Sequence, residues 1–224
     1  MRILSILTLS LLMLIGTAGQ LPAQSEKPDP AAFKEGTEYF RLAEPAAFVG
    51  LDNSQIEVTA FFWYGCGSCY QLDHMLYDWA QKLPEDVRFT LLPMTDTPPL
   101  DVHARIFLTL EKMGLGRDAH QAVFDRFQNE RRPINVPEQL PELARLLKVD
   151  EGALKAAYNS TEVNDQMQKL DKIMFVYNIQ GVPSMVIDGR YVFDLGTAHG
   201  SVGYFGLADR LIEERRQARR AEGK

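Results

Sequence analysis

The sequence predicts an α/β fold in which a block of helices is inserted between two groups of strands. Near the start, two β-forming runs, over residues 56–64 and 87–92, flank a segment with helical periodicity. Near the end, two more runs, over residues 184–188 and 191–195, flank an Asp-Gly pair that is typical of a hairpin turn. The long stretch between these groups has apolar residues at helical spacing.

The first strand and helix follow from local patterns. The run Ile56 to Tyr64 is rich in β-branched and aromatic residues with little polar alternation, which predicts a strand buried on both faces. A short edge strand is expected before it, over residues 38–42. After Gly65 the pattern becomes helical, and Pro84 ends it. The predicted apolar stripe of this helix consists of Leu72, Met75, Leu76 and Trp79.

The middle of the chain predicts five consecutive helices. Pro98 opens the first, and Asp101 is expected to cap it. Asp150 is expected to start the fourth, and Ser160 to cap the fifth. The Leu and Met stripes of these helices predict core packing rather than a cofactor site. A last helix is predicted over residues 201–220, where a basic end suits the helix macrodipole better than a binding patch.

The first 23 residues have the pattern of a secretory signal peptide. One arginine follows Met1, residues 3–15 contain no charge, and small residues come next. We expect cleavage after Ala23, with Gly19 as a second possible site and an uncleaved membrane anchor as the competing interpretation. Export would place the chain in an oxidising compartment, where disulfides persist.

Composition excludes several functional classes. The 224 residues are 46% hydrophobic and 24% charged, as in ordinary globular proteins. The formal net charge of −6 argues against nucleic-acid binding, which needs a basic face. Two cysteines are too few for a disulfide scaffold, and a structural zinc site needs about four ligands.

Both cysteines lie in Cys66-Gly67-Ser68-Cys69, directly after the buried strand and at the start of a helix. Unsatisfied N–H groups and the positive helix end favour a thiolate at Cys66. Cys66 is therefore predicted to be the exposed, attacking sulfur. Cys69, one turn further on, is predicted to be buried and to resolve a mixed disulfide.

Other uses of this motif fit the sequence less well. Half a zinc site lacks partners, because His74, His103, His120 and His199 are scattered along the chain. A c-type haem needs a histidine after the second cysteine, where Tyr70 stands. A purely structural disulfide is an unusual use of so tight a loop. His74, His103 and His120 are expected on helix surfaces, and His199 is expected to cap the last helix or stay solvated.

A second motif, Gly181-Val182-Pro183-Ser184, directly precedes a strand. A proline cannot donate to a strand ladder, so its position calls for an explanation. One interpretation is an ordinary trans loop. The other is a cis-proline that brings the Val182 backbone beside the cysteines, where a substrate chain can pair with it as an added strand.

The two segments FFWYGCGSCYQ and GVPSMVIDGRY resemble the DsbA family of periplasmic thiol–disulfide oxidoreductases. The resemblance implies a thioredoxin-like fold with an inserted α-helical domain. It divides the chain into a signal peptide (1–23), a first thioredoxin-like part (24–96), the helical insert (97–170) and a second part (171–224). The chain between Cys66 and Pro183 far exceeds the roughly 35–45 residues that a simple crossover needs, which leaves room for that insert.

The sequence also departs from the family pattern. DsbA proteins commonly carry Cys-Pro-His-Cys, whose histidine helps to stabilise the thiolate, whereas Gly67-Ser68 carries no positive charge. We therefore expect a smaller pKa depression at Cys66 and a potential below the about −120 mV of DsbA. Many members have a buried glutamate where this chain has Ala60, and Glu57 should face the opposite way.

These observations predict a periplasmic enzyme that introduces disulfide bonds into reduced exported proteins through Cys66 and Cys69. No organic cofactor or metal is expected, and the chain is expected to be monomeric. The family implies a DsbB-like membrane quinone reductase as electron acceptor, and a client groove is expected around Trp63, Tyr64 and Val182. Two alternatives stay open: a reductase or isomerase of the same fold, and a non-catalytic, chaperone-like binding module.

Overall fold

The computed structural model describes residues 32–43 and 55–223, so the predicted signal peptide lies outside the described residues. A mixed sheet forms the centre, in the order β1-β5-β4-β2-β3. Strands β2 and β3 are parallel, and the other neighbouring pairs are antiparallel. The strands are β1 (Phe40–Arg41), β2 (Ile56–Phe62), β3 (Val87–Pro93), β4 (Ser184–Ile187) and β5 (Tyr191–Asp194).

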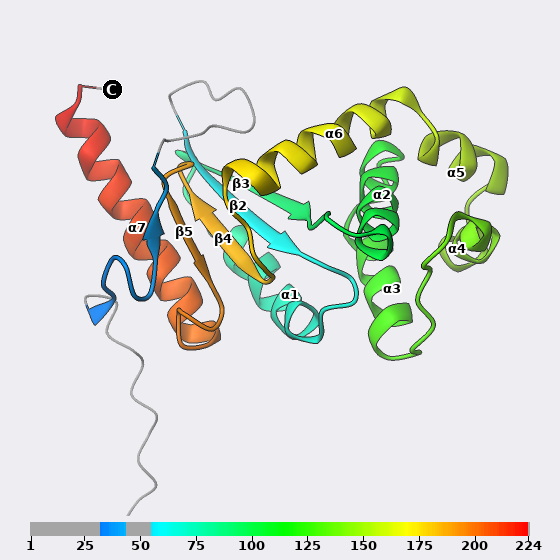
Figure 1. Cartoon of the computed structure of the whole chain (residues 1–224), viewed down its shortest axis with the longest axis horizontal. Helices are drawn as coiled ribbons and strands as arrows, with labels where there is room; N and C mark the ends of the chain where they lie inside the picture. The colour runs from blue at the N-terminus through cyan, green and yellow to red at the C-terminus, as the bar shows by residue number, and fades with distance from the viewer. Residues whose placement is uncertain (1–31, 44–54, 224) are drawn as a thin grey trace, which may run out of the picture.

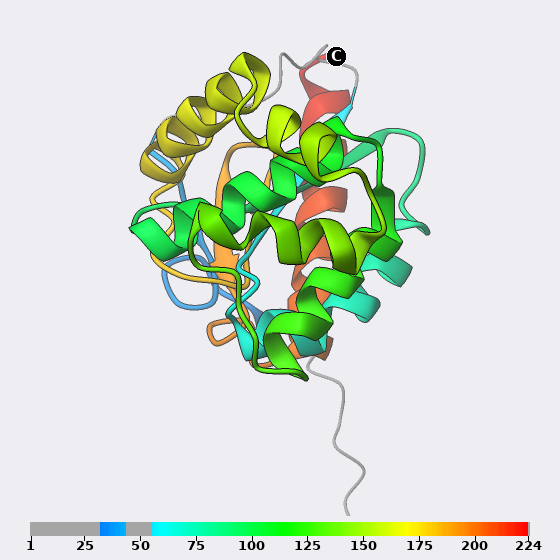
Figure 2. The same cartoon turned by 90° about the vertical axis from the view of Figure 1, so that its right-hand side faces the viewer.

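The helices divide between the two faces of this sheet (Figure 1). They are α1 (Gly67–Ala80), α2 (Pro98–Lys112), α3 (Gly116–Gln128), α4 (Leu140–Leu147), α5 (Glu151–Tyr158), α6 (Thr161–Val176) and α7 (Ser201–Ala221), with a short 3-10 helix η2 (Pro137–Gln139) before α4. Helix α1 connects β2 to β3, and α6 leads back to β4. In Figure 2 the helices α2 to α5 lie in front of the sheet and α7 lies behind it.

Strand β2 is buried along its whole length, as predicted. Because side chains alternate along a strand, its two faces enter different cores. Val58 and Ala60 pack against α1 and α7, whereas Phe61 packs against α6 and the helical block. Glu57 therefore points away from the Ala60 side, as its parity predicts, and it is buried.

The predicted turn and two of the three predicted caps are confirmed. Asp188 and Gly189, between β4 and β5, both have positive φ, as a two-residue hairpin of this type requires. The Asp150 and Ser160 side chains accept hydrogen bonds from the N–H groups of Ala153 and Val163. Asp101 is not a cap, which corrects the prediction, because α2 begins three residues earlier, at Pro98, and Thr97 occupies the cap position.

Helix α6 belongs to both halves of the molecule. Its first turns pack with α2 in the helical block, and Leu170 and Ile173 continue the same core toward the sheet. The helix runs unbroken across residue 170, where the insert was predicted to end. The second half of α6 therefore serves as the crossover helix that precedes β4.

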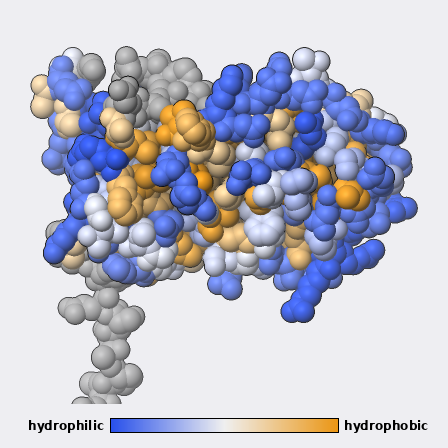
Figure 3. Space-filling view, in the orientation of Figure 1, coloured by the Kyte–Doolittle hydropathy of each residue, from blue (hydrophilic) through white to orange (hydrophobic). Residues whose placement is uncertain are grey.

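One face of the molecule carries apolar side chains. Figure 3 shows them gathered over strands β1 and β5 and the adjoining end of α6, whereas the helical block is mostly hydrophilic on this side. Exposed apolar side chains from these elements are Phe40, Phe175 and Val176.

Candidate active site

Cys66 is the N-cap residue of α1. Its backbone is extended, and its sulfur accepts a hydrogen bond from the Cys69 N–H at 3.1 Å. This N–H is one of the donors that the first turn of a helix leaves without an intrahelical partner. The sequence places a sulfur where Ser or Asp is usual, so the helix terminus itself stabilises negative charge on Cys66.

The environment lowers the pKa of Cys66 from its ordinary value of 9.0 to about 7. The hydrogen bond from the Cys69 thiol is the largest cause, and the backbone N–H groups of Cys69 and Ser68 add to it against the opposing effect of burial. The first turn of α1 contains no charged residue. The stabilisation of the thiolate therefore comes from dipoles and hydrogen bonds rather than from a full positive charge.

Cys69 differs from Cys66 in its exposure and in the direction of its pKa shift. It is buried, with 3% of its surface exposed, while Cys66 is partly exposed. Burial raises the pKa of Cys69 strongly, and the neighbouring Cys66 thiolate raises it further. Both cysteines are in the free thiol form in this structure. The geometry thus contains one ionisable, accessible sulfur and one protonated, enclosed sulfur.

Gly67 and Ser68 are both exposed on the first turn of α1. A methyl group at Gly67 would meet only the side-chain oxygen of Gln128, at an ordinary contact distance of 3.7 Å. The Gln128 amide in turn donates to the Tyr64 carbonyl oxygen at 2.7 Å. Helix α3 thereby holds the loop that leads into the cysteines.

The Val182–Pro183 loop lies beside Cys66. The peptide bond between these residues is cis, as the second interpretation of the motif predicted. The thiol of Cys66 donates to the Val182 carbonyl oxygen at 3.6 Å. Pro183 is buried while Val182 is partly exposed, so the Val182 backbone borders the reactive sulfur.

The Trp63 side chain packs against Gly65, the residue directly before Cys66. Its indole ring lies where a Cβ at Gly65 would sit, with ring atoms 2.2 Å from that position. The indole N–H donates to Nδ1 of His103 at 2.6 Å, and Nε2 of His103 lies 3.0 Å from the Asn135 side-chain oxygen. Gly65 is therefore required by packing against Trp63.

Two histidine predictions were wrong. His103 and His120 are buried, with 3% and 5% of their surfaces exposed, rather than lying on helix surfaces. His74 is exposed as predicted, and His199 stays largely solvated beside Glu38. Tyr64, expected in a client groove, is fully enclosed and lies 2.9 Å from Nδ1 of His120.

The predicted apolar stripe of α1 was wrong at Met75. Met75 is exposed, and its place in the stripe is taken by Asp73, which is 4% exposed. The buried residues of α1 are Cys69, Leu72, Asp73 and Leu76. The spacing 69, 72, 73, 76 is helical, but an acid within an apolar stripe does not by itself indicate burial. His120 was missed for the same reason, since it shares helical spacing with Val123, Phe124 and Phe127.

The described residues contain neither a candidate metal site nor a helix that could span a membrane. Among them, no group of three or more His, Cys, Asp or Glu side chains is arranged to hold a metal ion. No helix between residues 55 and 223 has the length and apolar character needed to cross a bilayer.

Comparison with known proteins identifies the family. A DSBA-like thioredoxin domain matches residues 85–211. The thiol:disulfide interchange protein DsbA of Azotobacter vinelandii is 39% identical over 198 residues, which cover 88% of this chain and 92% of that protein. The chain belongs to the DsbA family. A DsbA of Pseudomonas aeruginosa is 38% identical over 186 residues, covering 83% of this chain and 87% of the relative.

Solved DsbA structures share the fold. The crystal structure of Pseudomonas aeruginosa DsbA matches with a TM-score of 0.81 at 38% identity, covering 85% of this chain and 98% of that one. The oxidoreductase DsbA of Xylella fastidiosa matches with a TM-score of 0.73 at 26% identity, covering 80% and 95%. The predicted thioredoxin-like fold with a helical insert is therefore confirmed.

Proposed function

We propose that this member of the DsbA family oxidises cysteine pairs in exported proteins through Cys66 and Cys69. The observation that carries the proposal is the contrast between the two sulfurs. Cys66 is accessible with its pKa lowered to about 7, and Cys69 is enclosed with its pKa raised. An attacking or leaving sulfur needs the first environment, and a resolving sulfur needs the second.

The cycle begins with a disulfide between Cys66 and Cys69. A substrate thiolate attacks the Cys66 sulfur, the Cys66–Cys69 bond breaks, and Cys69 leaves and takes up a proton. A second substrate thiolate attacks the substrate sulfur of the mixed disulfide, and Cys66 leaves as a thiolate. Two electrons pass from the substrate, which gains a disulfide, to the protein, which becomes a dithiol.

The Val182 backbone is suited to hold the substrate during this exchange. It is partly exposed, it borders Cys66, and it enters strand β4 directly. An extended segment on either side of a substrate cysteine can pair with exposed backbone of this kind, as in strand addition. Pairing would place the substrate sulfur against Cys66 with little dependence on the substrate sequence.

The Cys66 environment favours a mild oxidant. Its pKa of about 7 lies near the characteristic value of about 7 for thioredoxin and above the about 3.5 of DsbA. A less stabilised thiolate makes the disulfide a weaker electron acceptor. This observation also favours a second candidate function, a reductase or isomerase of the same fold.

We propose partners and a location for this chain by analogy with the family. We propose that the chain works in the periplasm after removal of its leader, as a monomer, on reduced exported proteins. A DsbB-like membrane quinone reductase would reoxidise the dithiol. The exchange itself uses only sulfur and protons, so no metal or organic cofactor takes part.

The deciding experiment is the equilibrium of the purified protein with glutathione buffers. A Cys66–Cys69 potential above about −180 mV, and below the about −120 mV of DsbA, is expected for a mild disulfide donor. A value near the about −270 mV of thioredoxin would exclude the oxidase and favour the reductase. A disulfide that stays closed throughout would indicate a non-catalytic binding module.

A trapping experiment tests the roles of the two cysteines. Cys69→Ala should accumulate a mixed disulfide between Cys66 and a disulfide-bonded client peptide. The Cys66 thiolate attacks the client disulfide and displaces one client thiolate, and the resolving thiol that would release the client is missing. Cys66→Ala is the matched control and should trap nothing. The double variant with Ser at both positions should fold and lose all exchange activity, and retained activity would contradict the mechanism.

A further inference from the structure

A buried chain of polar groups links helix α3 to the segment around the cysteines. The Tyr64 hydroxyl lies 2.9 Å from Nδ1 of His120, and Nε2 of His120 lies 3.1 Å from Oδ1 of Asp73. The guanidinium of Arg117 pairs with the other oxygen of Asp73 and stacks over the Tyr77 ring. The chain therefore joins the loop after β2, helix α1 and helix α3.

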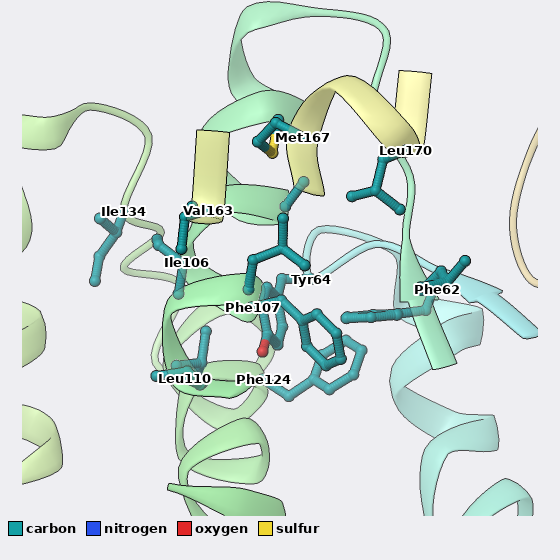
Figure 4. Packing of buried hydrophobic residues seen from close by; sticks show 14 of the residues in the cluster. Phe62, Tyr64, Ile106, Phe107, Leu110, Phe124, Ile134, Val163, Met167 and Leu170 are labelled. Carbon is teal, nitrogen blue, oxygen red and sulfur yellow. The ribbon is translucent and has the colours of Figure 1, made fainter. Parts of the chain in front are cut away.

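The surroundings of His120 are aromatic. Its ring lies between 5.0 and 5.6 Å, centre to centre, from those of four aromatic side chains, Phe62, Tyr64, Phe107 and Phe124. Figure 4 shows these four side chains gathered together, with the Tyr64 ring reaching into the group. Polar groups in such a core are tolerated only when they are hydrogen-bonded, so the contacts of His120 are needed where it stands.

This chain of contacts reaches the redox pair from two sides. Tyr64 is two residues before Cys66, and its carbonyl is also held by Gln128 of α3. Asp73 is one turn after Cys69 on the same buried face of α1. Hydrogen bonds from His120 and Arg117 keep the pKa of Asp73 low although burial acts to raise it, so this carboxyl is ionised. Its charge contributes to the raised pKa of Cys69.

We propose that His120 is a positioning residue for the disulfide exchange, which holds the Asp73 carboxylate together with Arg117 and so sets how readily the Cys66–Cys69 pair accepts electrons. This inference rests on the proposed function of that pair. Reduction adds negative charge to the cysteine pair, and the Asp73 carboxylate, one turn after Cys69 on the same buried face of α1, disfavours that charge. A carboxylate that is paired on both oxygens repels the thiolate less than one that has lost a partner.

Two substitutions should act in opposite directions. Asp73→Asn removes the charge and keeps the shape, so the constant for reduction of the protein by glutathione should rise about tenfold, which is about 30 mV. His120→Phe leaves Asp73 with one partner, so that constant should fall by several-fold. The pKa of Cys66, followed by thiolate absorbance, should fall in Asp73→Asn and rise in His120→Phe.

Two further variants separate positioning from packing. His120→Gln retains an N–H donor for Asp73 and should return the constant toward the wild-type value. His74→Gln removes an exposed histidine next to Asp73 and should leave it unchanged. Shifts in the same direction for Asp73→Asn and His120→Phe, or none beyond twofold, would overturn the inference.

The outcomes remain distinct from those for the proposed function. If His120→Phe fails to fold by circular dichroism, Asp73→Asn decides alone, and an unchanged constant overturns the inference. If the wild-type protein equilibrates with glutathione and the variants have the same constant, only the role of His120 is refuted. A wild-type disulfide that never equilibrates refutes the proposed function and this inference together.

Discussion

The sulfur of Cys66 lies 3.6 Å from the carbonyl oxygen of Val182, although 116 positions separate the two residues in the chain. The same sulfur accepts the N–H of Cys69 at 3.1 Å. The N–H stabilises a thiolate, whereas the carbonyl oxygen presents partial negative charge to it. Cys66 therefore sits between a group that favours ionisation and one that opposes it.

Alkylation of Cys66 should follow its thiolate. The rate with iodoacetamide should rise with pH around a midpoint of about 7 in the reduced protein. Because the Cys69 thiol is the largest cause of the lowered pKa, Cys69→Ala should move the midpoint upward. Cys69→Ser keeps a hydroxyl donor and should move it less. Equal midpoints in all three proteins would show that the helix terminus alone sets the pKa.

The stability of the reduced protein should depend on pH. The pKa of Cys66 is lower in the folded state than its ordinary value of 9.0, so the unfolded state binds more protons between about pH 7 and pH 9. The free energy of unfolding should rise with pH across this window, and the gain should be lost as pH falls through about 7. Urea unfolding of the oxidised protein is the control, since its disulfide cannot titrate.

The active-site dipeptide should control the potential. Ser68→His adds a positive charge beside the Cys66 thiolate, which should lower the pKa of Cys66 and make the disulfide more oxidising by about tenfold in its glutathione equilibrium. Ser68→Asn is the neutral control. Ser68 is exposed, so neither side chain has to enter the core. A response to Asn as large as that to His would exclude charge as the cause.

Two glycines near Cys66 should respond differently to the same change. A Cβ at Gly65 would lie 2.2 Å from the Trp63 ring, whereas one at Gly67 meets nothing closer than 3.7 Å. Gly65→Ala should destabilise the fold by about 1–3 kcal/mol and shift Trp63 fluorescence, because the indole must leave His103. Gly67→Ala should do neither. Urea unfolding checks both, and equal stability would contradict the role of Trp63 packing.

The hairpin turn at Asp188 should depend on its charge. Asp188 is buried and pairs with Arg215 at 2.7 Å and with Arg219. Asn suits the same left-handed turn, so Asp188→Asn removes the ion pairs and keeps the turn. The free energy of unfolding should fall by about 3 kcal/mol. Glu35→Gln breaks the exposed pair with Arg41 and should change stability by less than about 1 kcal/mol. Similar losses of stability in the two variants would show that burial of Asp188 does not strengthen its ion pairs.

Local patterns were enough to predict most of the fold. The strand over 56–64, the Asp-Gly turn and the caps at Asp150 and Ser160 each rest on neighbouring residues, and the structure confirms them. The predicted cap at Asp101 was wrong because Asp101 is the fourth residue of α2, and its place in the helix depends on where the preceding loop ends. The cis geometry at Pro183 was one of two interpretations, since nothing local distinguishes them.

Local sequence patterns did not predict the buried polar residues. Asp73 and His120 satisfy each other across two helices that are far apart in sequence. A single sequence shows each as a polar residue on an amphipathic helix, and the usual inference is solvent exposure. Their mutual contact exists only after α3 docks on α1, so it belongs to tertiary structure alone.

Helix α6 joins the helical block to the segment that carries Val182. One end is packed against α2 in the helical block, and the other ends at Val176, six residues before Val182. Because the helix is continuous, a change in its tilt at the helical block would also displace the backbone beside Cys66. Large folded clients and short peptides should therefore differ in how fast they exchange, even when their cysteines are equally reactive.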